Sequence, residues 1–421
     1  MDQMDSNVIV LGMGRTGCAV KEYLEKRGAN VKCLDDAKEY DGEASLCRRY
    51  DYAVISPGIA MTHPAVLSLK QSGVPILSEL DLAYINCESR NIYAISGTNG
   101  KTTTCTILNA LLSTVGHSHL VGNIGTPWIS RLDVIEKGDA VVVETSSFQI
   151  EQSSLFRPFI AALTNVGEDH LDRHITAEAY QSIKLSLLDR AKVKVINKGD
   201  PLQRDVPHAV SYSDCDASAD FYLSARTIYH HGKKYPLPIL SRGTSYDLDY
   251  LCAFAVASTA FGVKRRFLQL YNQVKIPSYR FCYIGKLQGA KVYNDSKGTN
   301  IDATLFAAGN IKEPLALILG GSDKGEDYSR LFSGLGDHVK RIYITGGNAA
   351  RIYNESGNFR RRCHLVPDLR AALFDFMEDP LPALLFSPAS ASFDRYHNYE
   401  ERGRDFDEIF TQCGGVKDEL R

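Results

Sequence analysis

The run Gly97-Thr98-Asn99-Gly100-Lys101-Thr102-Thr103 has the residue types of a phosphate-binding loop. An apolar stretch precedes it and a helical pattern follows, so we expect it to connect a strand to a helix. Backbone N–H groups at such a helix start point toward phosphate oxygens, and the helix dipole adds partial positive charge. Lys101 would neutralise the β- and γ-phosphates, and the Thr102 hydroxyl would reach magnesium. Ile95 replaces the first glycine of the common pattern, so the loop is a shortened variant.

Two further groups are candidate metal ligands. Glu144 directly follows the apolar run 141–143, and His170 follows the apolar run 160–163 within Asn165-Val166-Gly167-Glu168-Asp169-His170. Ligands in α/β proteins gather where parallel strands end, so both would lie at the same sheet edge as the phosphate loop. Taken alone, Glu144 could equally be a surface carboxylate, and the run ending at His170 a polar helix start.

A second glycine-rich segment lies near the N-terminus. Gly12-Met13-Gly14-Arg15-Thr16-Gly17 follows an apolar run, and Asp35 comes about twenty residues later. Taken alone, this spacing indicates a dinucleotide-binding fold and favours NAD.

Short apolar runs alternate with helical patterns along the whole chain, which predicts parallel sheets covered by helices. We expect an α/β protein of three domains, with boundaries at the polar stretch 86–91 and near 276–278. These are a Rossmann-like domain (1–88), a central P-loop domain with a parallel sheet (89–277) and a Rossmann-like C-terminal domain (278–421).

The composition is that of a soluble globular protein. Its 421 residues carry a formal charge of -2, which implies no general nucleic-acid or membrane-surface partner. The ten cysteines show no zinc spacing and are expected to be reduced. No apolar run is long enough to span a bilayer and no signal peptide is visible. We therefore expect a cytoplasmic protein, and a monomer.

Several runs, in this order, carry a family resemblance: Gly97 to Thr103, Gly122-Asn123-Ile124-Gly125, Glu144-Thr145-Ser146-Ser147-Phe148-Gln149, Asn165 to Arg173, Asn294-Asp295-Ser296-Lys297-Gly298-Thr299-Asn300, Gly320-Gly321-Ser322-Asp323-Lys324, and Ser387-Pro388-Ala389-Ser390-Ala391-Ser392-Phe393-Asp394. Together they resemble the Mur ligases, and the C-terminal runs resemble the D-glutamate-adding branch. The resemblance extends from Val8 to about Phe410.

The resemblance implies roles around ATP and two magnesium ions. Lys101 and Thr102 would bind phosphates and metal, Glu144 would bind one magnesium and His170 would help to bind the second. Lys184 matches the family's carbamylated lysine, an anion able to bind a hard cation. Alone, Lys184 would be interpreted as a solvated helix residue.

The resemblance also assigns the two ends of the chain. In the C-terminal domain, residues expected to face the nucleotide are Arg280, Asp295 and Lys297, and those expected around D-glutamate are Thr299, Lys324, Ser392 and Tyr399. In the N-terminal domain, the glycine-rich segment would bind UDP instead of NAD, with candidates Thr16, Asp35, Asp36, Ser56, Pro57, Gly58 and Asn123.

The sequence departs from the family pattern at two places. Asp36-Ala37 replaces the usual Thr-Arg, so a cationic contact to the UDP phosphates is missing there. Gly243-Thr244-Ser245-Tyr246-Asp247-Leu248-Asp249 replaces the family's Gly-x-His-Asn-x-x-Asn run. The adenine-contacting asparagine is then either replaced by Asp249 or missing. We expect altered nucleotide affinity or base selectivity with activity retained.

The implied activity is ATP-dependent addition of D-glutamate to UDP-N-acetylmuramoyl-L-alanine through an acyl phosphate, in bacterial peptidoglycan synthesis. The nearest alternative is another Mur ligase or a folylpolyglutamate synthase-like ligase. No Asp-Asn-Pro-Arg run of the diaminopimelate-adding kind is present. An NAD-dependent oxidoreductase would leave the loop at Lys101 unexplained, and a non-catalytic module would bind ATP without turnover.

Overall fold

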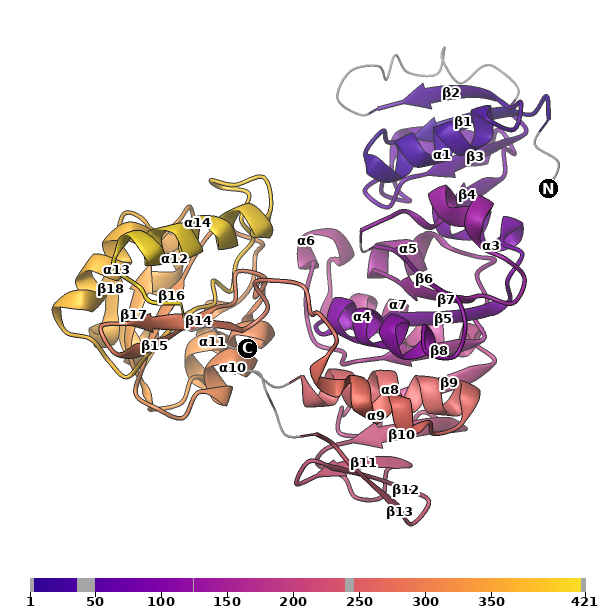
Figure 1. Cartoon of the computed structure of the whole chain (residues 1–421). Helices are drawn as coiled ribbons and strands as arrows, with labels where there is room; N and C mark the ends of the chain where they lie inside the picture. Colours follow the sequence, from indigo (N-terminus) through magenta and orange to yellow (C-terminus); the bar gives the residue numbers. More distant parts are fainter. Residues whose placement is uncertain (1–3, 36–49, 124, 239–245, 418–421) are drawn as a thin grey trace. The chain divides into compact units, whose positions relative to one another are not determined.

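The computed structural model describes residues 4–35, 50–123, 125–238 and 246–417 (Figure 1). These residues form three β-sheets flanked by helices, so the fold is α/β as predicted. The chain forms two compact units: the first comprises 1–166, 181–238 and 247–275, and the second comprises 167–180, 239–246 and 276–421. The first unit contains two of the sheets and the second unit contains one.

The N-terminal sheet is parallel, with the strand order β2-β1-β3-β4. Its elements are β1 (Asn7–Leu11), α1 (Arg15–Glu25), β2 (Asn30–Leu34), β3 (Tyr52–Ile55), α2 (Pro64–Gln71), β4 (Ile76–Ser78) and α3 (Glu79–Asn86). Alternate residues of β1 belong to two hydrophobic clusters, one with α1 and α3 and the other with α2. Both faces are covered, which explains the continuous apolar run in β1.

The central sheet has the order β13-β12-β11-β10-β9-β8-β5-β7-β6. Its strands are β5 (Asn91–Ser96), β6 (Ser118–Gly122), β7 (Ala140–Glu144), β8 (Ile160–Leu163), β9 (Val193–Asn197), β10 (Ala209–Ser213), β11 (Phe221–Ser224), β12 (Thr227–His230) and β13 (Lys233–Pro236). The helices of this region are α4 (Lys101–Leu112), η2 (Trp128–Val134), α5 (Ser147–Gln152), α7 (Ala177–Arg190), α8 (Asp247–Phe261), α9 (Arg265–Gln269) and η3 (Leu270–Asn272).

The central sheet is parallel from β6 to β11 but ends in an antiparallel hairpin, β12–β13. The sheet is therefore mainly parallel, as predicted, with an antiparallel addition at this edge. His231 and Gly232 form the two-residue turn, and both have positive φ, at 47° and 73°. Two left-handed residues are what a tight hairpin turn requires, and glycine at the second position is the local sequence signal for it.

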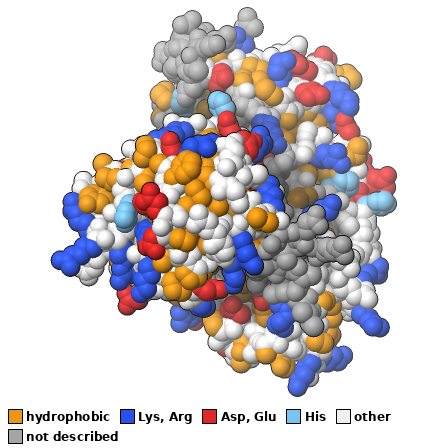
Figure 2. Space-filling view, turned by 60° about the vertical axis from the view of Figure 1, so that its left-hand side comes forward, with side chains coloured by type: hydrophobic (Ala, Val, Ile, Leu, Met, Phe, Trp, Pro, Cys, Tyr) orange, Lys and Arg blue, Asp and Glu red, His pale blue; other side chains and the backbone are white. Residues whose placement is uncertain are grey.

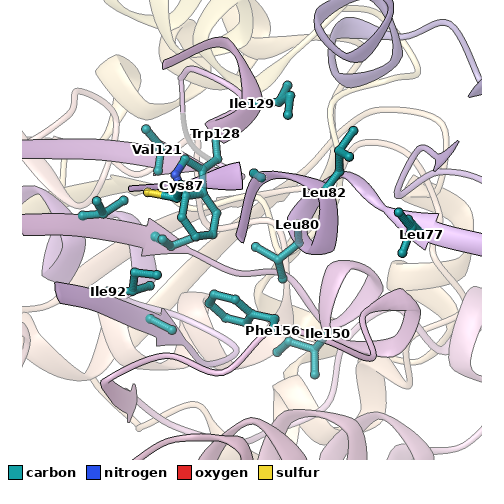
Figure 3. Packing of buried hydrophobic residues seen from close by; sticks show 14 of the residues in the cluster. Leu77, Leu80, Leu82, Cys87, Ile92, Val121, Trp128, Ile129, Ile150 and Phe156 are labelled. Carbon is teal, nitrogen blue, oxygen red and sulfur yellow. The ribbon is translucent and has the colours of Figure 1, made fainter. Parts of the chain in front are cut away.

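One hydrophobic cluster joins the first two sheets (Figure 3). It contains Leu80 and Leu82 of α3 together with Trp128 and Phe156 of the central region. The Trp128 and Phe156 rings meet edge to face, with centroids 5.9 Å apart. A shared apolar core between two sheets explains why they form one compact unit, because separating them would expose this surface to water.

The sheet of the second unit has the order β14-β15-β19-β16-β17-β18 and is parallel except for β14. Its strands are β14 (Cys282–Leu287), β15 (Ala290–Asn294), β16 (Leu315–Leu319), β17 (Val339–Ile344), β18 (Cys363–Leu365) and β19 (Ala383–Phe386). Its helices are α6 (Leu171–His174), α10 (Ile301–Asn310), α11 (Tyr328–Gly334), α12 (Ala349–Asn354), η4 (Gly357–Arg362), α13 (Leu369–Glu378) and α14 (Tyr399–Gln412). Helices α10, α11 and α12 share one cluster with the strands, and α13 and α14 share another.

The surface shown in Figure 2 has acidic, basic and apolar side chains interspersed. Within the described residues, no helix has the length and hydropathy that crossing a bilayer requires. The described cysteines are all free thiols, as expected.

Candidate active site

The phosphate loop connects β5 to α4, as predicted, and two of its glycines are required by geometry. Gly97 has φ +142°, and a Cβ there would lie 1.9 Å from Thr164 Oγ1. Gly100 has φ +81°, and its Cβ would lie 2.2 Å from Asp249 Oδ1. Both positions therefore exclude a side chain on conformational and steric grounds.

Asn165 holds the first half of the loop in place. Its carbonyl oxygen accepts from the Thr98 N–H at 2.9 Å, and its Oδ1 accepts from the Asn99 N–H at 3.0 Å. Its amide group donates in return to the Asn99 carbonyl at 3.1 Å. The second half of the loop opens α4 at Lys101, and N–H groups in the first turn of a helix have no partner within the helix. That those groups, up to Thr103, bind phosphate stays a prediction.

Two lysines converge on the loop from different helices. Lys101 Nζ donates to the carbonyl oxygens of Gly97 and Thr98 at 2.8 and 2.7 Å. Lys184 Nζ, from α7, donates to the same Gly97 oxygen at 2.7 Å. Lys184 is only 1% exposed, so its interpretation as a solvated helix residue is wrong. A fully buried lysine is rare unless its charge is paired, so the burial of Lys184 points to a specific role for this side chain.

Glu144 ends β7 and pairs in register with Ile95 of β5, so its carboxylate lies on the strand next to the loop. It is 2% exposed, which excludes the surface-carboxylate alternative. Its Oε1 accepts from Asn123 Nδ2 at 2.9 Å, while Oε2 is buried with no hydrogen-bond partner among the described residues. A buried carboxylate oxygen of this kind fits a hard cation such as Mg²⁺. The described residues contain no cluster of three or more His, Cys, Asp or Glu that could hold a metal by itself.

His170 lies on the segment 167–180, which groups with the second unit and not with the sheet of the phosphate loop. It has a positive φ of 55°, uncommon for a residue other than glycine. Its Nε2 lies 3.7 Å from Asp169 Oδ2, and its side chain is 38% exposed. The expected meeting of His170 and Glu144 thus involves two units, and it stays a prediction.

Three loops meet at one edge of the second unit's sheet. They follow β15, β19 and β16, which are parallel neighbours, so their carboxyl ends lie side by side. Backbone bonds join them: Ala389 N–H donates to Gly298 O at 2.9 Å, and Ser322 N–H donates to Ala391 O at 2.9 Å. Three of the residues predicted to bind D-glutamate lie in these loops, one in each: Thr299, Lys324 and Ser392.

Arg402 of α14 holds two of these loops together from below the surface. It is 3% exposed, and its guanidinium donates to the carbonyl oxygens of Ser296, Ser390 and Ala391 at 2.8 to 3.0 Å. Burial lowers the pKa of Arg402 to about 10, so the group remains charged at neutral pH. Nearby, Lys297 Nζ lies 4.1 Å from the centroid of the Tyr399 ring, so these two predicted residues are in contact.

Asp295 is engaged by the protein itself. Its Oδ1 accepts from the Phe281 N–H at 2.9 Å and its Oδ2 from Ser387 Oγ at 2.7 Å. Burial raises the pKa of Asp295 to about 7. Arg280, the other predicted nucleotide contact, has a buried Nε with no hydrogen-bond partner among the described residues. The role of both groups toward a nucleotide stays a prediction.

The N-terminal loops are bonded to each other and to helix α5 of the central region. Ser56 Oγ donates to Gly12 O at 2.6 Å, so this predicted substrate residue closes the glycine-rich turn. Gln152 Nε2 donates to the carbonyl oxygens of Ser56, Pro57 and Ile59 at 2.7 to 3.4 Å. Thr16 lies in the first turn of α1 and Asp35 is exposed just after β2. Pro57 is half-buried, and Gly58, next to it, is exposed.

The two departures from the family pattern lie partly outside the described residues, namely Asp36, Ala37 and the run from Gly243 to Ser245. Asp249 is described, on the first turn of α8. Its Oδ1 accepts from Thr104 Oγ1 of α4 at 3.2 Å and lies against Gly100. A carboxylate therefore stands directly beside the phosphate loop.

Comparison with known proteins places this geometry in a family. Residues 95–250 match the Mur ligase middle domain. A UDP-N-acetylmuramoylalanine–D-glutamate ligase of Caldicellulosiruptor bescii is 30% identical, covering 98% of this chain and 99% of the relative. The chain belongs to the Mur ligase family. The enzyme of the same name from Geotalea uraniireducens is 32% identical, covering 96% of this chain and 97% of the relative.

Solved Mur ligase structures share the fold. The MurF ligase of Thermotoga maritima, in complex with ADP, matches with a TM-score of 0.62 and 17% identity, covering 97% of this chain and 96% of that one.

Some residues of this Mur ligase that shape the site were missed by sequence reasoning. Asn165 belongs to a run that carries the resemblance, but its bonds to Asn99 join residues 66 positions apart and have no local signal. Arg402 lies in a charged helix, and nothing in that pattern shows that it turns inward. Glu326 was missed although its spacing from Lys324 places it in the same loop.

Proposed function

We propose that this chain is an ATP-dependent ligase that adds D-glutamate to UDP-N-acetylmuramoyl-L-alanine. The observation that carries the proposal is the phosphate loop, with two lysines and the free oxygen of Glu144 beside it. Relatives with this name match essentially the whole chain, which supports the proposal. Use of ATP follows from membership of the family.

Forming an amide from a carboxylate requires activation, because hydroxide is a poor leaving group. We infer that the L-alanyl carboxylate attacks the γ-phosphate of ATP, giving an acyl phosphate and ADP. The amine of D-glutamate then attacks the acyl carbon, and inorganic phosphate leaves. Lys101 and the first-turn N–H groups of α4 would offset the negative charge that gathers on the phosphate oxygens.

The unpaired, buried Oε2 of Glu144 is a suitable ligand for magnesium. Glu144, with its free oxygen, and Thr102, in the first turn of α4, would hold one ion, and His170 a second. Magnesium bound to a nucleotide neutralises phosphate charge and polarises the oxygens of the group being transferred.

The proposal includes a carbamylated Lys184. Without a carbamate, the Lys184 ammonium donates to the Gly97 carbonyl oxygen in a buried place. Burial makes the charged form of a lysine energetically costly. Reaction of the amine with carbon dioxide would convert it to a carbamate, an anion that can bind a metal ion. The remaining predicted residues, from Thr16 and Asp35 to Tyr399, would bind UDP, ATP or D-glutamate as the family resemblance implies.

The direct test is product identification by mass spectrometry. Purified protein with ATP, Mg²⁺, UDP-N-acetylmuramoyl-L-alanine and D-glutamate should give the D-glutamyl product together with one phosphate per amide. Lys101→Ala is the matched variant and should lose ligation, with at least a hundredfold lower rate of phosphate release. Turnover of L-alanine or a diamino acid in place of D-glutamate would contradict the substrate assignment.

A further inference from the structure

Glu326 is a buried carboxylate with one oxygen in use and one oxygen free. It is 8% exposed, and its Oε2 accepts from the Ile301 N–H, at the start of α10, at 3.1 Å. Its Oε1 is buried and has no hydrogen-bond partner among the described residues. Leaving a carboxylate oxygen unpaired in a buried place is costly, so a ligand with a donor group would find a prepared partner here.

The surroundings of Glu326 carry an excess of negative charge. Lys324, two residues earlier, pairs with Asp169 at 3.4 Å, and Arg330 pairs with Asp302 and Glu168. These pairings engage Lys324 and Arg330 with other carboxylates. Burial and the nearby Asp169 carboxylate raise the pKa of Glu326 to about 7, although the Lys324 charge acts in the opposite direction. An added cation would reverse that rise, because an opposite charge favours the ionised form.

Lys324 and Glu326 present opposite charges two residues apart on one loop. The two residues flank Gly325, and the positive charge of Lys324 acts to lower the pKa of Glu326. An α-amino acid carries a carboxylate and an ammonium on the same carbon atom, which is the complementary arrangement. If a substrate carboxylate takes Lys324 from Asp169, the ammonium of the same molecule can reach the free oxygen of Glu326.

We propose that Glu326 binds the α-ammonium group of the incoming amino acid. This assignment deepens the proposed function and rests on it, and it concerns a residue outside the set that the family resemblance supplied. The role of Glu326 is recognition: it selects an amino acid over a dicarboxylic acid that lacks the amine.

The test compares D-glutamate with glutarate, which has both carboxylates and no amine. Glu326→Gln keeps an oxygen for the Ile301 N–H and removes the charge, so the N-terminus of α10 stays capped. We expect the KM for D-glutamate to rise about tenfold or more, because a hydrogen bond to a charged group is lost. The inhibition constant of glutarate should stay within about twofold of the wild-type value, and the KM for ATP should not change.

Glu355→Gln is the matched control, because the Glu355 carboxylate accepts from the Tyr328 N–H at the start of α11 at 2.8 Å in the same way. It should leave the KM for D-glutamate unchanged. Glu326→Asp keeps the charge on a shorter side chain and should fall between wild type and Glu326→Gln. This second variant covers the case in which the glutamine variant does not fold.

Equal weakening of D-glutamate and glutarate in Glu326→Gln would overturn the assignment, since a general disturbance of the loop would do that. An unchanged KM for D-glutamate would also overturn it. Both outcomes leave the proposed function intact, because the wild-type product would still form. A wild-type protein that makes no product with D-glutamate would overturn the proposed function and this assignment with it.

Discussion

Gly100 offers a test in which the cost of a substitution divides into two parts. An alanine there would have to keep φ near +81°, a left-handed conformation that costs a residue with a Cβ about 1–2 kcal/mol. Its Cβ would also lie 2.2 Å from Asp249 Oδ1, so that carboxylate must move. Moving it breaks the bond from Thr104 Oγ1, and a hydrogen bond to a charged group is worth about 1.5–3 kcal/mol. The smaller figures together give about 2.5 kcal/mol.

The free protein can avoid this cost by changing the loop, but the nucleotide-bound state must restore the loop. Gly100→Ala should therefore weaken ADP binding in the presence of Mg²⁺ by roughly seventyfold or more, since about 1.4 kcal/mol is a factor of ten. Isothermal titration calorimetry measures the affinity directly. Gly116→Ala is the control, because a Cβ at Gly116 meets no atom within 4 Å.

The Asp249→Ala background separates the two parts. There the steric conflict is gone, and Gly100→Ala should cost only the conformational part, roughly five- to thirtyfold in affinity. Wild-type affinity in Gly100→Ala would refute the geometry of the loop. An equal loss in both backgrounds would refute the contact with Asp249.

Three further predictions concern groups around the same site. Lys184→Ala should be inactive and regain ligation with acetate, which can take the place of the carbamate; a normal rate without acetate would remove the carbamate hypothesis. Glu144→Gln should raise the Mg²⁺ concentration for half-maximal activity at least tenfold in a magnesium titration, and an unshifted curve would show that this carboxylate holds no metal. Asp81 is fully buried and accepts from Ser153 Oγ and three backbone N–H groups of 154–156. Asp81→Ala would leave these donors unpaired, at a cost of about 1–3 kcal/mol for each donor that stays buried, and should lower the thermal midpoint by several degrees. An unchanged midpoint would contradict the role of this carboxylate in joining the first two sheets.

The elements that were predicted well are those whose signal is local. The apolar run 160–163 forms strand β8 with the same bounds, because a buried parallel strand is a short continuous apolar run. The phosphate loop was predicted for the same reason, since its glycines and lysine lie within seven residues. The hairpin β12–β13 was missed because its strands are polar, although His231-Gly232 carried the turn signal.

The parts of the site that could not be predicted depend on contacts between distant residues. The burial of Lys184 follows from α7 lying against the phosphate loop, 87 positions away in sequence. The environment of Glu326 also depends on distant residues, because one of its oxygens accepts from the Ile301 N–H, 25 positions away in sequence. The grouping of His170 with the second unit likewise depends on tertiary contacts that no local pattern contains.

The measurement closest to the central claim follows one oxygen atom through the reaction. UDP-N-acetylmuramoyl-L-alanine labelled with ¹⁸O in its terminal carboxylate is incubated with ATP, Mg²⁺, D-glutamate and the protein, and the released phosphate is analysed by mass spectrometry. Attack of that carboxylate on the γ-phosphate predicts one ¹⁸O atom in each phosphate and none in ADP. Unlabelled phosphate released together with the amide product would contradict the acyl-phosphate route.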